Sequence, residues 1–192
     1  EARKLKLPII PRAAMLAEIL RFKSAITVSG SHGKTTTTSI IASIFESSKL
    51  DPTIINGGII NKYDTNAKLG KGDWIIAEAD ESDGSFTVLP SIISIISNID
   101  AEHMEYYGNL QNLIKAFVRY AQNIPFYGFI SVYIDDKNIK KVIKQLPEKR
   151  IFKYGLSSDA NISYKNLKFF SKGAKIFSKF DVLINFGKIE TI

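Results

Sequence analysis

Residues 29–38 read SGSHGKTTTT, and the interpretation of the whole chain depends on this short stretch. It follows the apolar run Ala25 to Val28, which is predicted to be a strand, and it leads into Lys34 to Lys49, whose apolar spacing predicts a helix. Two glycines, a lysine and four threonines stand where a packed helix would begin. A strand, a glycine turn and a helix in this order form one half of a parallel α/β unit.

The turn between the two glycines has the chemistry of a phosphate site. Backbone N–H groups of such a turn converge at the positive end of the helix dipole, Lys34 adds a mobile positive charge, and the Thr35 hydroxyl is placed to bind magnesium. The spacing is shorter than in the commonest P-loop, so a purely structural turn is the alternative. His32 is given only a contact role. The predicted nucleotide contacts are Gly30, Ser31, His32, Gly33, Lys34, Thr35 and Thr36.

A second group of polar residues is the acidic run Glu78 to Asp83, which directly follows the predicted strand Trp74 to Ala77. In a parallel α/β sheet, ligands bind beyond the carboxyl ends of the strands, where the glycine turn must also lie. The carboxylates repel one another, and magnesium would relieve that repulsion. We therefore expect at least one of them to bind magnesium, with an acidic solvated loop as the alternative.

A third group lies at the end of the apolar run Ile92 to Ile99, where His103 is close in sequence to Asn98, Asp100 and Glu102. At the carboxyl end of a strand, His103 is a candidate ligand for a second magnesium or an orienting group for a substrate phosphate. A plain surface histidine is the alternative.

The remaining pattern predicts an α/β fold, with a mostly parallel sheet flanked by helices and a C-terminal antiparallel β segment. Within the helix Lys34 to Lys49, the apolar side chains of Ile40, Ile41, Ile44 and Phe45 are expected to point inward. The other predicted helices are Arg12 to Phe22, Asn109 to Asn123 and Asn138 to Leu146; the other strands are Thr53 to Ile55 and Phe129 to Ile134, with antiparallel strands from Arg150 onward.

Composition narrows the possible functions. The chain has 192 residues, no cysteine and two histidines, which excludes disulfides and thiolate metal sites. No apolar run approaches the roughly 18 residues needed to cross a bilayer, so we expect no membrane association and a cytoplasmic location. The net charge of +7 lies in the C-terminal part, because residues 136–192 carry 13 basic and 5 acidic groups. These lysines are interpreted as the solvated face of a sheet, with nucleic-acid binding as the alternative.

The three polar stretches, in this order, resemble the ATP-binding domain of the Mur ligases. The short spacing in Gly30-Ser31-His32-Gly33-Lys34-Thr35 is typical of that family, and the runs Glu78 to Phe86 and Asn98 to Met104 are similar to its alanine-adding branch. The resemblance covers roughly Leu7 to Tyr154, with a weaker tail. It implies ATP and Mg²⁺ as cofactors, Lys34 on the ATP phosphates, Thr35 and Glu78 on one magnesium, and Glu78 with His103 on the second.

The resemblance also implies an organisation and a reaction. Residues 1–22 would connect to a UDP-sugar domain absent from this chain, residues 23–192 would form the central ATP-binding domain, incomplete at its C-terminus, and a C-terminal domain would also be absent. The implied reaction joins L-alanine to UDP-N-acetylmuramate through an acyl phosphate, with release of ADP. It belongs to peptidoglycan synthesis, and hence to cell-wall biogenesis, cell shape and cell division.

The fragment is expected to be inactive alone, and the sequence does not specify an oligomeric state. Three rival functions stay open. They are a ligase that recycles whole peptides or extends folate, a P-loop NTPase without ligase activity, and a basic binding module in residues 137–188.

Overall fold

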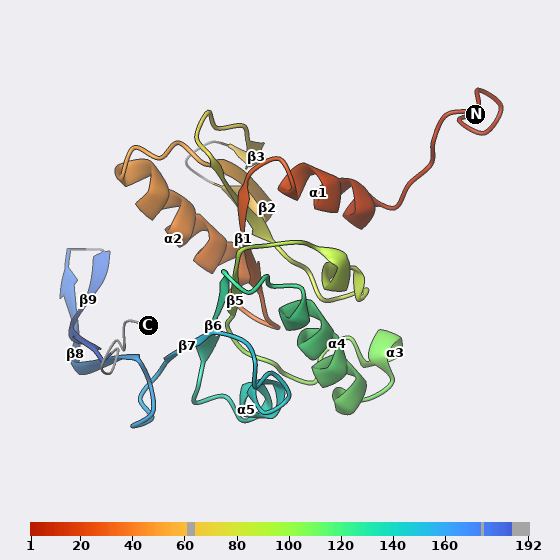
Figure 1. Ribbon diagram of the computed structural model, residues 1–192. Helices are drawn as coiled ribbons and strands as arrows, with labels where there is room; N and C mark the ends of the chain where they lie inside the picture. Colours follow the sequence, from red (N-terminus) through yellow and green to blue (C-terminus); the bar gives the residue numbers. More distant parts are fainter. Residues whose placement is uncertain (61–63, 174, 186–192) are drawn as a thin grey trace.

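Figure 1 shows the computed structural model, which describes residues 1–60, 64–173 and 175–185. The strands in this part of the chain are β1 (Ser24–Ser29), β2 (Thr53–Ile60), β3 (Thr65–Lys68), β4 (Trp74–Glu78), β5 (Ile93–Ile96), β6 (Phe129–Tyr133), β7 (Ile151–Tyr154), β8 (Ile162–Lys172) and β9 (Lys175–Ile184). They form one sheet in the order β3-β2-β4-β1-β5-β6-β7-β8-β9. Neighbours from β2 to β8 pair in parallel, whereas β3 and β9 are antiparallel at the two edges. The predicted mostly parallel α/β fold is confirmed.

Helices cover both faces of the central strands. They are α1 (Arg12–Leu20), α2 (Lys34–Ser47), α3 (Met104–Tyr107), α4 (Leu110–Gln122) and α5 (Lys137–Ile143), with a 3-10 turn η1 at Ser85–Val88. Figure 1 shows α2 on one side of the sheet and α4 on the other. No helix in the described ranges is both long enough and apolar enough to cross a bilayer.

Side chains that alternate along one strand reach two separate cores. Ile75 and Ala77 of β4 belong to the larger core, which contains Phe117 of α4, whereas Ile76 packs in a smaller core with Ala42 of α2. A strand buried on both faces needs apolar residues at successive positions, because its side chains alternate between the faces. This requirement explains the continuous apolar runs in the sequence.

The prediction for the inward face of α2 is partly wrong. Ile40 and Ile44 are 56% and 58% exposed, whereas Thr38 and Ala42 are buried and Ile41 packs against the smaller core. The buried positions of α2 follow helical spacing from Thr38 onward. The polar Thr38 therefore lies on the buried face, where a purely apolar pattern predicts a residue such as isoleucine.

The C-terminal prediction also needs a correction. The strand β7 pairs in parallel with β6, although all the strands after Arg150 were expected to be antiparallel. Helix α5 connects β6 to β7 and returns the chain to the same end of the sheet, as a parallel pair requires. The antiparallel part is the β8–β9 hairpin, whose side chains are largely exposed.

The parallel register brings three strand ends to one edge of the sheet. Val28 of β1 pairs with Glu78 at the end of β4, and Ser29 pairs with Ile96 at the end of β5. The polar segments that follow these strands therefore meet at the carboxyl edge, where α/β proteins bind ligands.

Candidate functional site

The turn between β1 and α2 combines two glycines with positive φ. Gly30 has φ 134°, and Gly33 has φ 79° in the left-handed region that L side chains rarely adopt. Helix α2 begins at Lys34, so the N–H groups of Lys34, Thr35 and Thr36 lie in its first turn, where no intrahelical acceptor exists. These amides form the positive end of a 14-residue helix, the backbone arrangement that accepts phosphate oxygens.

The earlier part of the turn is bound to the segment that follows β5. The Ser31 N–H donates to the Asn98 carbonyl at 3.0 Å, and the His32 N–H donates to Asn98 Oδ1 at 2.8 Å. Two amides of the predicted phosphate cradle therefore already have protein acceptors. Direct nucleotide contacts by Gly30, Ser31 and His32 stay a prediction, and the amides of the first turn of α2 are the better placed donors.

The ammonium of Lys34 is directed back over the turn. Its Nζ donates to the carbonyl of Gly30 at 2.8 Å and more weakly to that of Ser31 at 3.4 Å. It also lies 3.0 Å and 2.9 Å from the two carboxylate oxygens of Glu81. The lysine is thus held beside the first turn of α2 by three oxygen-bearing groups.

Glu81 is the residue of this site that the sequence analysis did not single out. Its side chain is 0% exposed, and burial raises the pKa of its carboxyl, although the hydrogen bond from Lys34 acts in the opposite direction. The Tyr107 hydroxyl donates to the Glu81 carbonyl, and burial raises the pKa of that phenol as well. Glu81 is therefore the fixed counter-ion of Lys34.

Thr35 and Glu78 come together as the sequence analysis expected. The Thr35 hydroxyl donates to Glu78 Oε2 at 2.9 Å, and the N–H of Gly57 donates to the same oxygen at 2.9 Å. A Cβ on Gly57 would lie 2.8 Å from Glu78 Oε1, so the carboxylate lies directly against the backbone of β2. A hydroxyl and a carboxylate oxygen are ligands that magnesium prefers, so this pair fits the ion.

His103 lies beside Glu81. Its Nε2 is 3.7 Å from Glu81 Oε1, its Nδ1 is 3.6 Å from Glu105 Oε1, and its backbone is left-handed with φ 57°. Ligand atoms of Glu81, Glu102 and His103 all lie within 4.8 Å of one another, a donor set that fits a divalent ion. In the described residues, His103 forms ion pairs with Glu81 and Glu105, and a magnesium shared by Glu78 and His103 stays a prediction.

Residues 28–191 match the family described as the Mur ligase middle domain. The chain belongs to the Mur ligase family. It is similar to the UDP-N-acetylmuramate--L-alanine ligase of Brucella anthropi, with 46% identity over 98% of this chain and 40% of that relative. The relative of the same name from Methylocella silvestris is 48% identical over 84% of this chain and 34% of its own length.

Solved structures agree with this assignment. UDP-N-acetylmuramate-alanine ligase from Thermotoga maritima has a TM-score of 0.73 and 25% identity, covering 88% of this chain and 37% of that one. The UDP-N-acetylmuramate:L-alanyl-gamma-D-glutamyl-meso-diaminopimelate ligase from Neisseria meningitides has a TM-score of 0.80 at 20% identity, covering 96% of this chain and 59% of that one, which shows a shared fold.

The family match begins at residue 28, whereas the predicted resemblance began at Leu7. It continues past Tyr154 to residue 191, where the resemblance was described as weaker. The chain also spans about two fifths or less of the curated relatives that it matches.

In this Mur ligase domain, the side chain of His32 makes contacts that were not predicted from the sequence. Its Nε2 lies 3.2 Å from Asp100 Oδ2 and 3.6 Å from Glu102 Oε1. These contacts join the turn to the segment after β5, and a nucleotide contact by His32 stays a prediction. The clustering of acids near Asn98 in the sequence was a signal for these contacts, but their partner came from a distant part of the chain.

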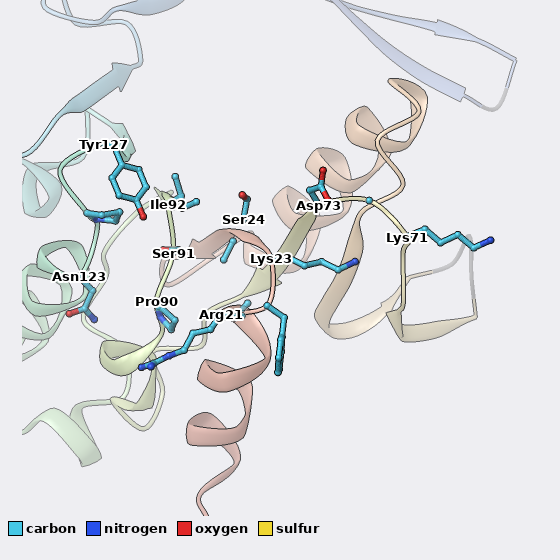
Figure 2. A pocket seen from close by; sticks show the side chains of 15 residues that line it. Arg21, Lys23, Ser24, Lys71, Asp73, Pro90, Ser91, Ile92, Asn123 and Tyr127 are labelled. Carbon is cyan, nitrogen blue, oxygen red and sulfur yellow. The ribbon is translucent and has the colours of Figure 1, made fainter.

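A separate cavity of about 690 Å³ lies at the amino ends of the parallel strands, away from the phosphate turn at their carboxyl ends (Figure 2). Its lining includes Ser24, Asp73 and Ile92, which stand at or just before the amino ends of β1, β4 and β5. The ammonium of Lys23 donates to the carbonyl of Gly70 at 2.6 Å and to the hydroxyl of Thr53 at 3.0 Å. This cavity is therefore distinct from the phosphate turn.

Proposed function

We propose that this chain is the nucleotide-binding part of an ATP-dependent ligase that joins L-alanine to UDP-N-acetylmuramate. The observation that carries the proposal is the meeting of Lys34, Thr35 and Glu78 at the start of α2, where amide donors, an ammonium group and magnesium-type ligands are adjacent. The curated relatives with this name, at 46% and 48% identity, support the choice of substrates.

The residues of the turn would act by positioning and by charge. The amides of Lys34, Thr35 and Thr36 would hold the phosphates of ATP, and the Lys34 ammonium would lie against the outer phosphate oxygens. Magnesium held by Thr35 and Glu78 would supply further positive charge to the phosphates. Negative charge develops on these oxygens as the phosphoryl group is transferred, so fixed donors lower the barrier without a protein nucleophile.

The longer relatives support a proposal for the organisation of the whole protein. We propose that residues 23–192 belong to the central ATP-binding domain and that residues 1–22 connect it to a domain for the UDP-sugar. We place a further C-terminal domain after it and assign the reaction to the cytoplasm, where ATP is available. Alanine selectivity would then depend on parts of the protein beyond this chain.

The test of the proposed function is an ADP-release assay with the full-length protein that carries this segment. Magnesium, ATP and UDP-N-acetylmuramate are supplied, and the acceptor is L-alanine, glutamate or a peptidoglycan tripeptide. We expect ADP release to depend on L-alanine. Dependence on the tripeptide alone would favour a recycling ligase, and ADP release without any acceptor would favour a simple NTPase.

Replacing Glu78 by alanine removes one predicted magnesium ligand. We expect the magnesium concentration for half-maximal ligase activity to rise about 10-fold or more, because the ion would lose its proposed carboxylate ligand beside Thr35. A magnesium titration at saturating ATP measures the effect. Glu148→Ala removes an exposed carboxylate and is the matched control. An unchanged titration in Glu78→Ala would contradict the assignment.

A further inference from the structure

Asn98 contacts the phosphate turn with its side-chain amide and its backbone carbonyl. Its Oδ1 accepts the His32 N–H at 2.8 Å, and its Nδ2 donates to the His32 carbonyl at 2.9 Å. Its own carbonyl accepts the Ser31 N–H at 3.0 Å. The Ser97 hydroxyl adds a further bond to the His32 carbonyl at 2.9 Å. The backbone N–H and C=O of His32, which belong to the two successive peptide groups on either side of its Cα, are therefore both bound by Asn98.

This contact falls on the part of the turn that has the most conformational freedom. His32 lies between Gly30 and Gly33, two residues without a side chain that would restrict φ. The N–H and the C=O of one residue lie in two successive planar peptide groups, so bonds to both restrict the φ and ψ of that residue. The Asn98 carboxamide thus performs the function that a neighbouring strand performs in a sheet.

We propose that Asn98 is a positioning residue for nucleotide binding. Because its carboxamide is used on His32, it acts through the turn and not on the phosphate. By fixing the backbone on both sides of His32, Asn98 sets the direction of the free amides at the start of α2 and the position of Lys34 before the nucleotide arrives. Preorganised donors bind more tightly because their ordering does not oppose binding. This inference rests on the proposed function, in that the ligand is taken to be a nucleotide.

The same residue connects two halves of the site. Asn98 belongs to the segment between β5 and α3 that also carries Glu102 and His103, which lie with Glu81. Glu81 also forms an ion pair with Lys34. The phosphate turn is therefore connected to the group of Glu81, Glu102 and His103 at two points, through Asn98 and through Lys34. We therefore expect a substitution of Asn98 to disturb the phosphate turn directly.

The test uses Asn98→Asp in the full-length protein, with ADP and magnesium as the probe. Aspartate keeps the size and the acceptor for the His32 N–H, but it places a carboxylate oxygen against the His32 carbonyl in place of a donor. We expect the Kd for ADP and the KM for ATP to rise about 10-fold or more, with a smaller change in kcat and unchanged KM for L-alanine. Amide exchange at His32 should become faster.

The matched control is Asn123→Asp. Its Nδ2 donates to the Thr87 carbonyl at 2.6 Å, so the substitution removes the same type of bond far from the turn in sequence. Asn98→Ala, which adds no charge, should weaken ADP binding in the same direction. The proposal is overturned if the Kd for ADP is unchanged in both Asn98 variants, or if Asn123→Asp weakens ADP binding equally.

Two results separate this inference from the proposed function. A wild-type protein that binds ADP but does not ligate L-alanine would contradict the proposed substrates, while the Asn98 variants would still test the positioning role through ADP affinity. A wild-type protein that does not bind ADP would overturn both.

Discussion

Replacing Lys34 by alanine is expected to lower the ligase rate of the full-length protein by about 100- to 1,000-fold, the usual effect of removing one fixed donor to a developing negative charge. The ammonium already lies beside the turn, 2.8 Å from the Gly30 carbonyl. Its loss would remove a positive charge from beside the proposed phosphate site. The measurement is kcat for ADP release at saturating ATP, and Lys115→Ala, an exposed lysine of α4, is the control.

The same substitution should also destabilise the fold, because Glu81 is completely buried and would lose its counter-ion. Removing one partner of a buried ion pair costs about 3–5 kcal/mol in general. The double variant Lys34→Ala with Glu81→Gln has no buried charge left at this pair, so it should recover stability without recovering activity. Ligase activity that returned together with stability would show that Lys34 has only a structural role.

Replacing Gly30 by alanine is expected to displace the phosphate turn. The new Cβ would lie 2.2 Å from the Ser97 hydroxyl oxygen and 3.0 Å from the Asn98 carbonyl oxygen, at a backbone φ of 134°. Strain of this kind costs about 1–3 kcal/mol, and the segment after β5 must move to relieve it. We expect the free energy of unfolding to fall by that amount and the affinity for ADP to fall at least about 10-fold.

Gly108→Ala is the matched control for this effect, because Gly108 also has a positive φ, of 73°, but nothing within 4 Å of its added Cβ. It should lose about 1–2 kcal/mol of stability and keep its affinity for ADP. Adding Ser97→Ala to Gly30→Ala removes the closest contact and should restore part of the affinity. Equal ADP affinities in Gly30→Ala and wild type would contradict the placement of the turn.

The sequence predicted the parts of the fold that follow local rules. Buried strands such as β4 are continuous apolar runs, and Asn109 marks the start of α4, where its side chain accepts the Asn112 N–H. The strand β3 was missed because Thr65–Lys68 is polar and lacks a periodic apolar pattern. Its strand conformation depends on pairing with β2, which no local pattern reveals.

The candidate site likewise has a part that the sequence predicted and a part that it did not. The spacing of Gly30, Gly33 and Lys34 indicated the turn, since residues in a turn are neighbours in sequence. The roles of Glu81 and Asn98 depend on side chains that reach across the carboxyl edge of the sheet to the turn. Glu81 was one of several acids in its run, and its complete burial and its ion pair with Lys34 are visible only in the structure.

Lys34 has protein partners before any nucleotide arrives, and this has a consequence for turnover. An incoming phosphate would compete with the carbonyl of Gly30 and the carboxylate of Glu81 for the protons of the ammonium, so the affinity gained would be the difference between two sets of bonds. When the spent nucleotide departs, the same oxygens can accept the ammonium again, which removes the penalty of leaving a bare cation behind. We therefore expect ADP to dissociate readily, so that the turn can be reloaded for the next cycle.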